Sequence, residues 1–313
     1  MFLLLSCTSG ESDVTKASQT CQLRSVKITQ DALFSFTTYR YGSTGLLLEQ
    51  IDSSNVSGKG FGAAYSLKRI QFFYDKSDLL TQRETSLSSY SKDNKVVDGP
   101  ARKFEEFRYN QAGQVISNQH FGYGNLLAEP NHTDIYEYAN GIISKISLCA
   151  SSVNKVITFR SGIPITVVDR KLESELSPGT ETSYVLNDKG YITSSKHTDG
   201  IGRIWITTQT YDPQGRSVLS VTQVDQETSS YRLEYDNQPR PETLLPALKG
   251  FPVYNLYGTK VNNVIKTSTD NQPSSVLNTS HTYNADGYPL QSQVTGPSIT
   301  TPITYVYSYQ SCQ

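Results

Sequence analysis

The sequence predicts an all-β protein, a large antiparallel meander of successive hairpins rolled into an open or partly closed barrel-like sheet. A short phrase recurs along the chain: an aromatic residue, Asp or Asn, two further residues, Gly, and then alternating apolar and polar residues. The composition agrees, because 21 Tyr residues beside abundant Ser, Thr and Val are typical of strands. The single Met, the single Trp and the lack of a sustained helical periodicity disfavour a helical bundle.

The recurring phrase predicts a tight hairpin turn. In the copy that begins at Tyr211, Asp212, Pro213 and Gly215 take the first, second and fourth places of a type I turn. The Asp or Asn side chain can accept hydrogen bonds from the backbone that follows, and Gly suits the positive φ of a bulged hairpin. Further copies begin at Tyr41, Tyr74, Tyr109, Tyr138, Phe159, Leu186, Tyr235 and Tyr283. Their spacing of about 20 to 35 residues is typical of a repeat array.

The phrase runs through residues 21–313 without an intervening linker or charge run, which predicts a single YD-repeat-like antiparallel β domain there. One exception to the strand pattern is the run 242–249, which favours a helix. Pro246 interrupts this run, so we expect no more than one short helical turn.

The N-terminus resembles the end of a bacterial lipoprotein signal, because the apolar run 2–5 is followed by Ser6 and Cys7, as in a lipobox. This resemblance implies a truncated signal at residues 1–6, lipidation of Cys7, and a membrane partner reached through the lipid. Residues 7–20 are then a flexible tether, rich in Ser, Thr and charge. The alternative is a free cysteine beside a small apolar segment.

Three further cysteines leave the disulfide pattern open. Cys21 opens the first expected strand and Cys312 follows the last, so a bond between them would join the chain ends if the sheet curls round. Cys149 is an equally valid partner or a buried thiol.

The repeated phrase resembles the YD repeat of RHS-type proteins. The longer pattern, which includes Cys21-Gln22-Leu23, the run 235–241 and the closing run 305–309 with Cys312, resembles Gram-negative surface lipoproteins of a domain-of-unknown-function group with a porin-like fold. This resemblance implies a partly closed barrel that is lipid-anchored to the outer membrane, on its periplasmic or cell-surface side. It implies no catalytic residues. The chain departs from long RHS proteins in having too few repeats to enclose a toxin.

The chemistry-bearing residues predict no catalytic site, no metal site and no cofactor. The histidines His120, His132, His197 and His281 lack a metal-ligand spacing, and we interpret the triplets at His132 and His197 as polar loop residues after a strand. Glu173 and Glu175 would share one face of a strand, which is common on solvated faces. The net charge of −1 disfavours nucleic acid as a partner.

Alternating tyrosines are the best candidates for a binding surface. Their rings can stack against sugars or peptides while the hydroxyl stays hydrogen-bonded. The alternative interpretation is a cross-strand ladder that only stabilises the sheet. The predicted surface comprises Tyr39, Tyr41, Tyr136, Tyr138, Tyr305, Tyr307 and Tyr309.

The sequence therefore favours a non-enzymatic cell-envelope lipoprotein, a β scaffold or binding protein for a glycan, peptide or partner protein. Two other classes remain open. A surface polysaccharide hydrolase would need two facing carboxylates in a cleft. An integral outer-membrane β-barrel would need a continuous apolar outer band.

Overall fold

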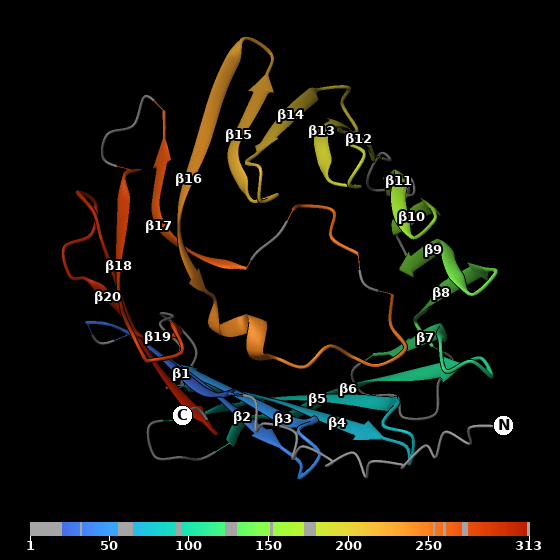
Figure 1. The fold of residues 1–313 in the computed structure, drawn as a ribbon, viewed down its shortest axis with the longest axis horizontal. Helices are drawn as coiled ribbons and strands as arrows, with labels where there is room; N and C mark the ends of the chain where they lie inside the picture. Colours follow the sequence, from blue (N-terminus) through green and yellow to red (C-terminus); the bar gives the residue numbers. More distant parts are fainter. Residues whose placement is uncertain are drawn as a thin grey trace, which may run out of the picture.

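The computed structural model describes residues 21–31, 33–55, 65–91, 96–122, 130–150, 153–171, 180–252, 254–258, 261–270 and 275–311. These residues form one 20-stranded antiparallel sheet in which each strand pairs with its sequence neighbours. The first strand, β1, also pairs with the last, β20, so the sheet closes on itself as a barrel (Figure 1). The predicted all-β meander is confirmed, and its closure goes further than the open or partly closed form that the sequence suggested.

The strands follow one another with short connections, and their bounds are β1 (Gln22–Gln30), β2 (Leu33–Tyr41), β3 (Leu47–Asn55), β4 (Tyr65–Tyr74), β5 (Leu80–Tyr90), β6 (Val96–Tyr109), β7 (Val115–Phe121), β8 (His132–Ala139), β9 (Ile142–Ala150), β10 (Val153–Arg160), β11 (Ile163–Lys171), β12 (Thr180–Leu186), β13 (Ile192–Thr198), β14 (Ile204–Tyr211), β15 (Ser217–Val224), β16 (Glu227–Pro239), β17 (Asn262–Thr269), β18 (Leu277–Tyr283), β19 (Pro289–Thr295) and β20 (Ile303–Gln310).

The recurring phrase forms the predicted hairpin turn. In the copy between β6 and β7, Asn110 Oδ1 accepts hydrogen bonds from the backbone N–H groups of Ala112 and Gln114, both at 3.0 Å. Gly113 has a φ of +73°, and the strand register shifts between Arg108 and Tyr109. This is the bulged hairpin that the Gly position predicts. The same Asx acceptor recurs at Asp75, Asn187, Asp212 and Asn284.

The tyrosine that opens the phrase ties one hairpin to the one before it. Tyr109 Oη donates a hydrogen bond of 2.8 Å to the carbonyl of Leu80, a fully buried residue at the start of β5. We call the set of such bonds the tyrosine ladder. Its other members are Tyr41 to Leu23, Tyr74 to Leu47, Tyr211 to Ile192, Tyr235 to Ser217 and Tyr309 to Pro289.

Residues 241–258, which connect β16 to β17, run inside the ring of strands (Figure 1). We call them the crossing segment, of which residue 253 is outside the described part. The segment begins with a 3₁₀-helix, η1 (Pro241–Leu244), so the expected single helical turn is confirmed. No helix within the described ranges has both the length and the apolar character to cross a membrane.

The crossing segment is hydrogen-bonded to the turns of the wall. Gly250 O accepts a 2.9 Å bond from the N–H of Val115, and Leu256 O accepts a 2.7 Å bond from the N–H of Ile192. Val115 and Ile192 hold the same place in their repeats, the first residue of the strand that leaves the turn. The segment therefore meets two repeats through the same backbone position.

Aromatic and aliphatic side chains pack at these contacts. The ring of Phe251 meets those of Phe107 and Tyr136 edge-on, with centroids 5.3 Å and 6.3 Å apart. Further along the segment, Tyr254 packs edge-on against Phe159 at 5.5 Å. The buried residues of the larger of two apolar clusters are Ile143, Ile146, Ile157, Phe159, Val167, Ile192 and Leu256.

The predicted signal at 1–6, the tether at 7–20 and the lipidated Cys7 lie outside the described residues. Cys21 is disulfide-bonded. Its neighbour Gln22 pairs with Gln310, which brings the ends of the described chain together. Cys312 is itself outside the described residues, so a Cys21–Cys312 bond stays a prediction.

Candidate functional site

Strand register separates the inner face of the wall from the outer one. Phe72 packs against the same buried cluster as Leu248 and Phe251 of the crossing segment, so it faces inward. Paired residues on neighbouring strands lie on the same face, and successive residues of a strand alternate between faces. Phe72 pairs with Arg83, Arg83 with Glu105, and Glu105 with His120. All of these therefore face the interior of the barrel.

The predicted tyrosines of β2 and β20 also face inward. Tyr39 pairs with Gln50, which pairs with Ile70, two residues from Phe72 on β4. Burial, followed by the negative charges of Asp52 and of Glu242 in η1, raises the pKa of Tyr39 to about 12. Burial likewise raises the pKa of Tyr309, with a contribution from Glu242. Since η1 lies inside the ring, these electrostatic contacts agree with the register (Figure 1).

Several of the predicted tyrosines are already engaged. Tyr41 and Tyr309 belong to the tyrosine ladder, and the rings of Tyr305 and Tyr307 stack with centroids 6.5 Å apart. The Tyr138 hydroxyl is buried and has no hydrogen-bond partner in the described part of the chain. These contacts show that some of the predicted tyrosines stabilise the sheet, and the binding surface formed by the tyrosine rings stays a prediction.

A polar network crosses the inner wall from β5 to β8. Arg83 Nη2 bonds both carboxylate oxygens of Glu105, at 2.7 Å and 2.5 Å. Asn118 Nδ2 lies 3.4 Å from Glu105 Oε2, and His120 Nε2 lies 2.9 Å from Asp134 Oδ2. Glu105, Asn118 and Asp134 are all buried. Buried carboxylates need such partners, because an unpaired charge away from water is costly.

The interpretation of the His-Thr-Asp triplets as loop residues was wrong. His132 opens β8 and His197 lies within β13, so both belong to strands. His120 and His132 are cross-strand partners whose rings stack with centroids 3.9 Å apart. Burial, reinforced by His120, lowers the pKa of His132. Sequence spacing could not reveal this grouping, because its residues lie on two strands, β7 and β8, and only the strand register brings them together.

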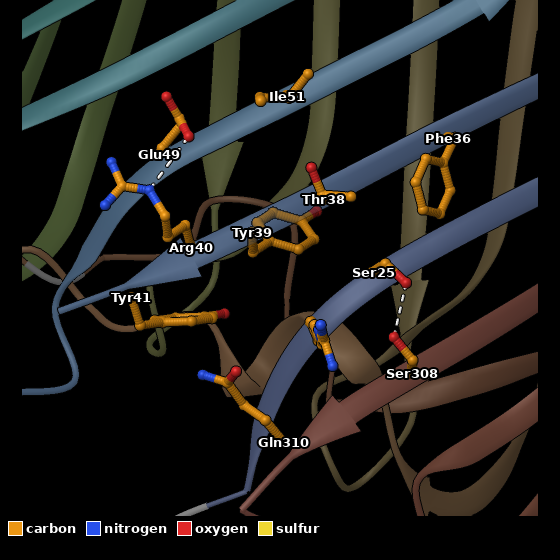
Figure 2. Close-up of a pocket in the computed structure, with 11 residues that line it drawn as sticks. Ser25, Phe36, Thr38, Tyr39, Arg40, Tyr41, Glu49, Ile51, Ser308 and Gln310 are labelled. Carbon is orange, nitrogen blue, oxygen red and sulfur yellow. Dashed lines mark hydrogen bonds and ion pairs between the residues drawn. The ribbon is translucent and has the colours of Figure 1, made fainter. Parts of the chain in front are cut away.

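The outer face carries a hollow of about 600 Å³ over β1, β2, β3 and β20. Figure 2 shows Arg40 reaching Glu49 at one end of it and Ser25 facing Ser308 at the other. It is lined by Arg24, Ser25, Phe36, Thr38, Arg40, Glu49, Ile51, Ser308 and Gln310, and it is also bordered by Tyr39 and Tyr41, whose strand positions face inward. This mixture of aromatic, hydroxyl, amide and charged side chains is suited to a polar ligand.

Glu49 is fixed between two arginines at the rim of this hollow. Its carboxylate lies 3.2 Å from Arg40 Nε and 2.5 Å from Arg69 Nη2. Burial opposes ionisation of this carboxyl, but the hydrogen bonds and charges of Arg69 and Arg40 outweigh it and lower its pKa. The group is thus held as an anion.

No protein-family model matches the chain, and no curated protein does so either. Among solved structures, the chain is similar to a porin-like protein from Bacteroides uniformis at 8% identity and a TM-score of 0.41, over 92% of this chain and 96% of that one. A porin-like protein from Bacteroides vulgatus matches at 13% identity and a TM-score of 0.36, over 68% of this chain and 95% of that one.

A third similarity is to a chain of the TcdB2-TccC3-Cdc42 structure, at 12% identity and a TM-score of 0.37, over 88% of this chain but 14% of that one. The two Bacteroides proteins are described as porin-like, and no family model links the chain to the YD repeat. The barrel itself rests on the strand pairing described above.

Proposed function

We propose that the protein is a non-enzymatic β-barrel of the bacterial cell envelope, held at the outer membrane by a lipid on Cys7, which binds a glycan in the outer hollow. The charged side chains on the outer face are the observation that favours a lipid-tethered barrel over one that spans the membrane. The composition of the hollow supports the glycan.

Ion pairs stand on the outer face in several parts of the wall. They occupy strand positions that alternate with inward-facing residues, and their side chains would meet lipid in an integral barrel. A Lys or Arg on the lipid face costs about 2–4 kcal/mol at the bilayer midplane. The pairs are Arg40 and Arg69 with Glu49, Arg102 with Glu84, Lys145 with Glu137, and Lys266 with Glu234.

The crossing segment adds support for a scaffold over a conducting barrel. Its backbone bonds to Val115 and Ile192 place it across the interior, and its aromatic side chains pack on the inner wall. The crossing segment thereby occupies interior space that an open passage through the barrel would need.

The hydrolase alternative is weaker at the hollow. A glycosidase needs two carboxyl groups about 5 to 9.5 Å apart, one of which donates a proton. Among the residues that line the hollow, Glu49 is the one carboxylate, and its two arginines keep its pKa low. Glu173 and Glu175 lie outside the described residues.

Membrane fractionation tests the tether. In a Gram-negative host expressing the full precursor, we expect the wild-type chain in the membrane fraction and the Cys7→Ala variant in the soluble fraction. Persistence of Cys7→Ala in the membrane after high-salt washing would favour the integral barrel. Cys149→Ala is the control, and it should fractionate like the wild type.

Calorimetric titration with a panel of neutral and acidic oligosaccharides tests the glycan. Phe36 lines the hollow on the outer face, and Phe73 is comparably exposed on β4, outside it. We expect the oligosaccharide that binds the wild type best to bind at least about tenfold more weakly to Phe36→Ser, because this variant lacks the aromatic ring on which a sugar can stack. Phe73→Ser should bind as the wild type does. Equal losses in both variants, or no binding by the wild type, would refute the assignment.

A further inference from the structure

Three side chains with metal-binding atoms meet on the inner wall. His120 comes from β7, and His132 and Asp134 come from β8. One donor atom from each lies within 4.8 Å of the other two. The side chains of His120 and Asp134 are 22% and 13% exposed, so the cluster is largely withdrawn from water and retains access from the interior.

The hydrogen bonds around His120 cannot all be satisfied at once. Its Nε2 lies 2.9 Å from Asn118 Nδ2 and also 2.9 Å from Asp134 Oδ2. A protonated Nε2 would face the amide hydrogens, and an unprotonated one would set its lone pair against the carboxylate. A cation between Nε2 and Asp134 would remove this conflict, because both are then electron-pair donors to it.

A second unsatisfied polar group, the side-chain amide of Asn118, lies beside His120. Asn118 is 6% exposed, and its Oδ1 has no hydrogen-bond partner in the described part of the chain. Exchanging the amide oxygen and nitrogen does not help, because the oxygen would then stand 3.4 Å from the carboxylate oxygen Oε2 of Glu105. A buried amide left unsatisfied in either orientation is costly, so this part of the polar network is incomplete among the described residues.

A carboxylate also lies behind His120. Glu105 Oε1 is 3.9 Å from His120 Nδ1, beyond hydrogen-bond distance, and Arg83 holds that carboxylate from the other side. Its negative charge favours a cation at the neighbouring ring. Within the described ranges, Arg83 is paired with Glu105, and Asp134 lies beside His120.

We propose that His120, His132 and Asp134 bind one divalent cation of the zinc type, with a fourth position open to the interior. Two imidazoles and a carboxylate form a nitrogen and oxygen donor set that suits zinc. The His132 ring, now stacked on His120, turns about its side-chain bonds to direct a nitrogen toward the ion. The ion would tie β7 to β8, and the site is independent of ligand binding in the outer hollow.

Titration of the untagged chain with Co²⁺, followed by displacement with Zn²⁺, tests the site. We expect one equivalent of Co²⁺ to bind with the visible absorption of a low-symmetry, tetrahedral-like ion, and Zn²⁺ to abolish that absorption and raise the thermal unfolding midpoint. Asp134→Asn and His132→Gln should each weaken Co²⁺ binding by at least about tenfold.

His197→Gln is the matched control, because His197 also faces inward, hydrogen-bonded to Thr182 on the neighbouring strand. It should bind Co²⁺ as the wild type does. Failure of the wild type to bind Co²⁺, or an equal loss in all three variants, would overturn the proposal. Near-ultraviolet circular dichroism shows whether each variant is folded. If one substitution unfolds the chain, the stoichiometry of Co²⁺ binding to the wild type and the effect of Zn²⁺ on its thermal unfolding midpoint still decide whether the site exists.

Discussion

Two stretches of the barrel wall differ in how the residue that opens the turn phrase is held. In β1–β6 and again in β13–β20, the tyrosine hydroxyls of β2, β4, β6, β14, β16 and β20 bond to the backbone carbonyls of the preceding strands, and that of Tyr283 on β18 bonds to the carboxylate of Asp236. In β8–β12 the corresponding positions hold Tyr138, Phe159 and Leu186. Of these, Phe159 and Leu186 have no hydroxyl, and the Tyr138 hydroxyl is without a partner in the described part of the chain.

The crossing segment packs on both stretches. Its Phe251 meets the ring of Tyr109, a member of the ladder, with centroids 6.4 Å apart. Its Leu256 joins Phe159 and Ile157 in the larger apolar cluster, and Tyr138 and Leu186 pack against that cluster. In β8–β12, apolar packing therefore holds the position that a hydroxyl bond also holds elsewhere. The Asx acceptor recurs in both stretches, at Asn110 and Asn187, but the turns after Tyr138 and Phe159 each contain two successive residues of positive φ, Asn140–Gly141 and Ser161–Gly162.

Leu256→Ala is the strongest way to break the packed stretch. Leu256 is 7% exposed, and its removal leaves a cavity between the segment and the wall. We expect the free energy of unfolding, measured by urea denaturation, to fall by about 2–5 kcal/mol. Tyr257→Ala, at a residue that is 43% exposed, should change it by less than about 0.5 kcal/mol. Similar losses in the two variants would show that the segment is not packed as described.

Tyr109→Phe tests the laddered stretch with a smaller expected effect. The substitution leaves the carbonyl of the fully buried Leu80 without its donor, at a cost of about 1–3 kcal/mol. Tyr138→Phe is the matched control. Because it removes a buried hydroxyl that has no partner among the described residues, it should leave urea stability unchanged or slightly higher. A loss in Tyr138→Phe equal to that in Tyr109→Phe would remove the distinction between the stretches.

Asp212→Asn has the smallest expected effect, a loss of stability that is present at neutral pH and disappears in acid. Burial opposes ionisation of Asp212, but the backbone N–H and guanidinium of Arg216 outweigh it and hold the pKa of Asp212 below its usual 3.8. A carboxylate with a lowered pKa stabilises the fold above its unfolded-state pKa, and that contribution is lost as the pH falls through the folded value.

Urea midpoints measured from neutral pH down to about pH 3 should therefore fall less steeply in Asp212→Asn than in the wild type. Asn fills the same place in the turn at Asn110, Asn187 and Asn284, so the hairpin should persist. An unchanged acid dependence would show that the Asp212–Arg216 pair, with Nε and Oδ2 at 2.6 Å, does not stabilise the fold.

Local signals carried most of the fold prediction. The geometry of each turn follows from its own Asp or Asn and Gly, so the hairpins could be predicted residue by residue. The crossing segment could not, because its contacts join residues such as Gly250 and Val115 that no local pattern connects. The His120–His132–Asp134 cluster depends on the register of β7 against β8, and a shift of one residue would put His132 on the outer face.

Closure of the barrel has a consequence for how the chain can fold and what it can join. Because β1 and β20 pair with each other, neither presents a free backbone edge on which another chain could template a strand. The seam joins partners as distant as Ser25 and Ser308, whose hydroxyls lie 2.7 Å apart. Each hairpin can form as soon as its two strands have been synthesised. The seam, however, cannot close until β20 is available to pair with β1. Partly folded chains with an open seam are therefore the species most prone to aggregation.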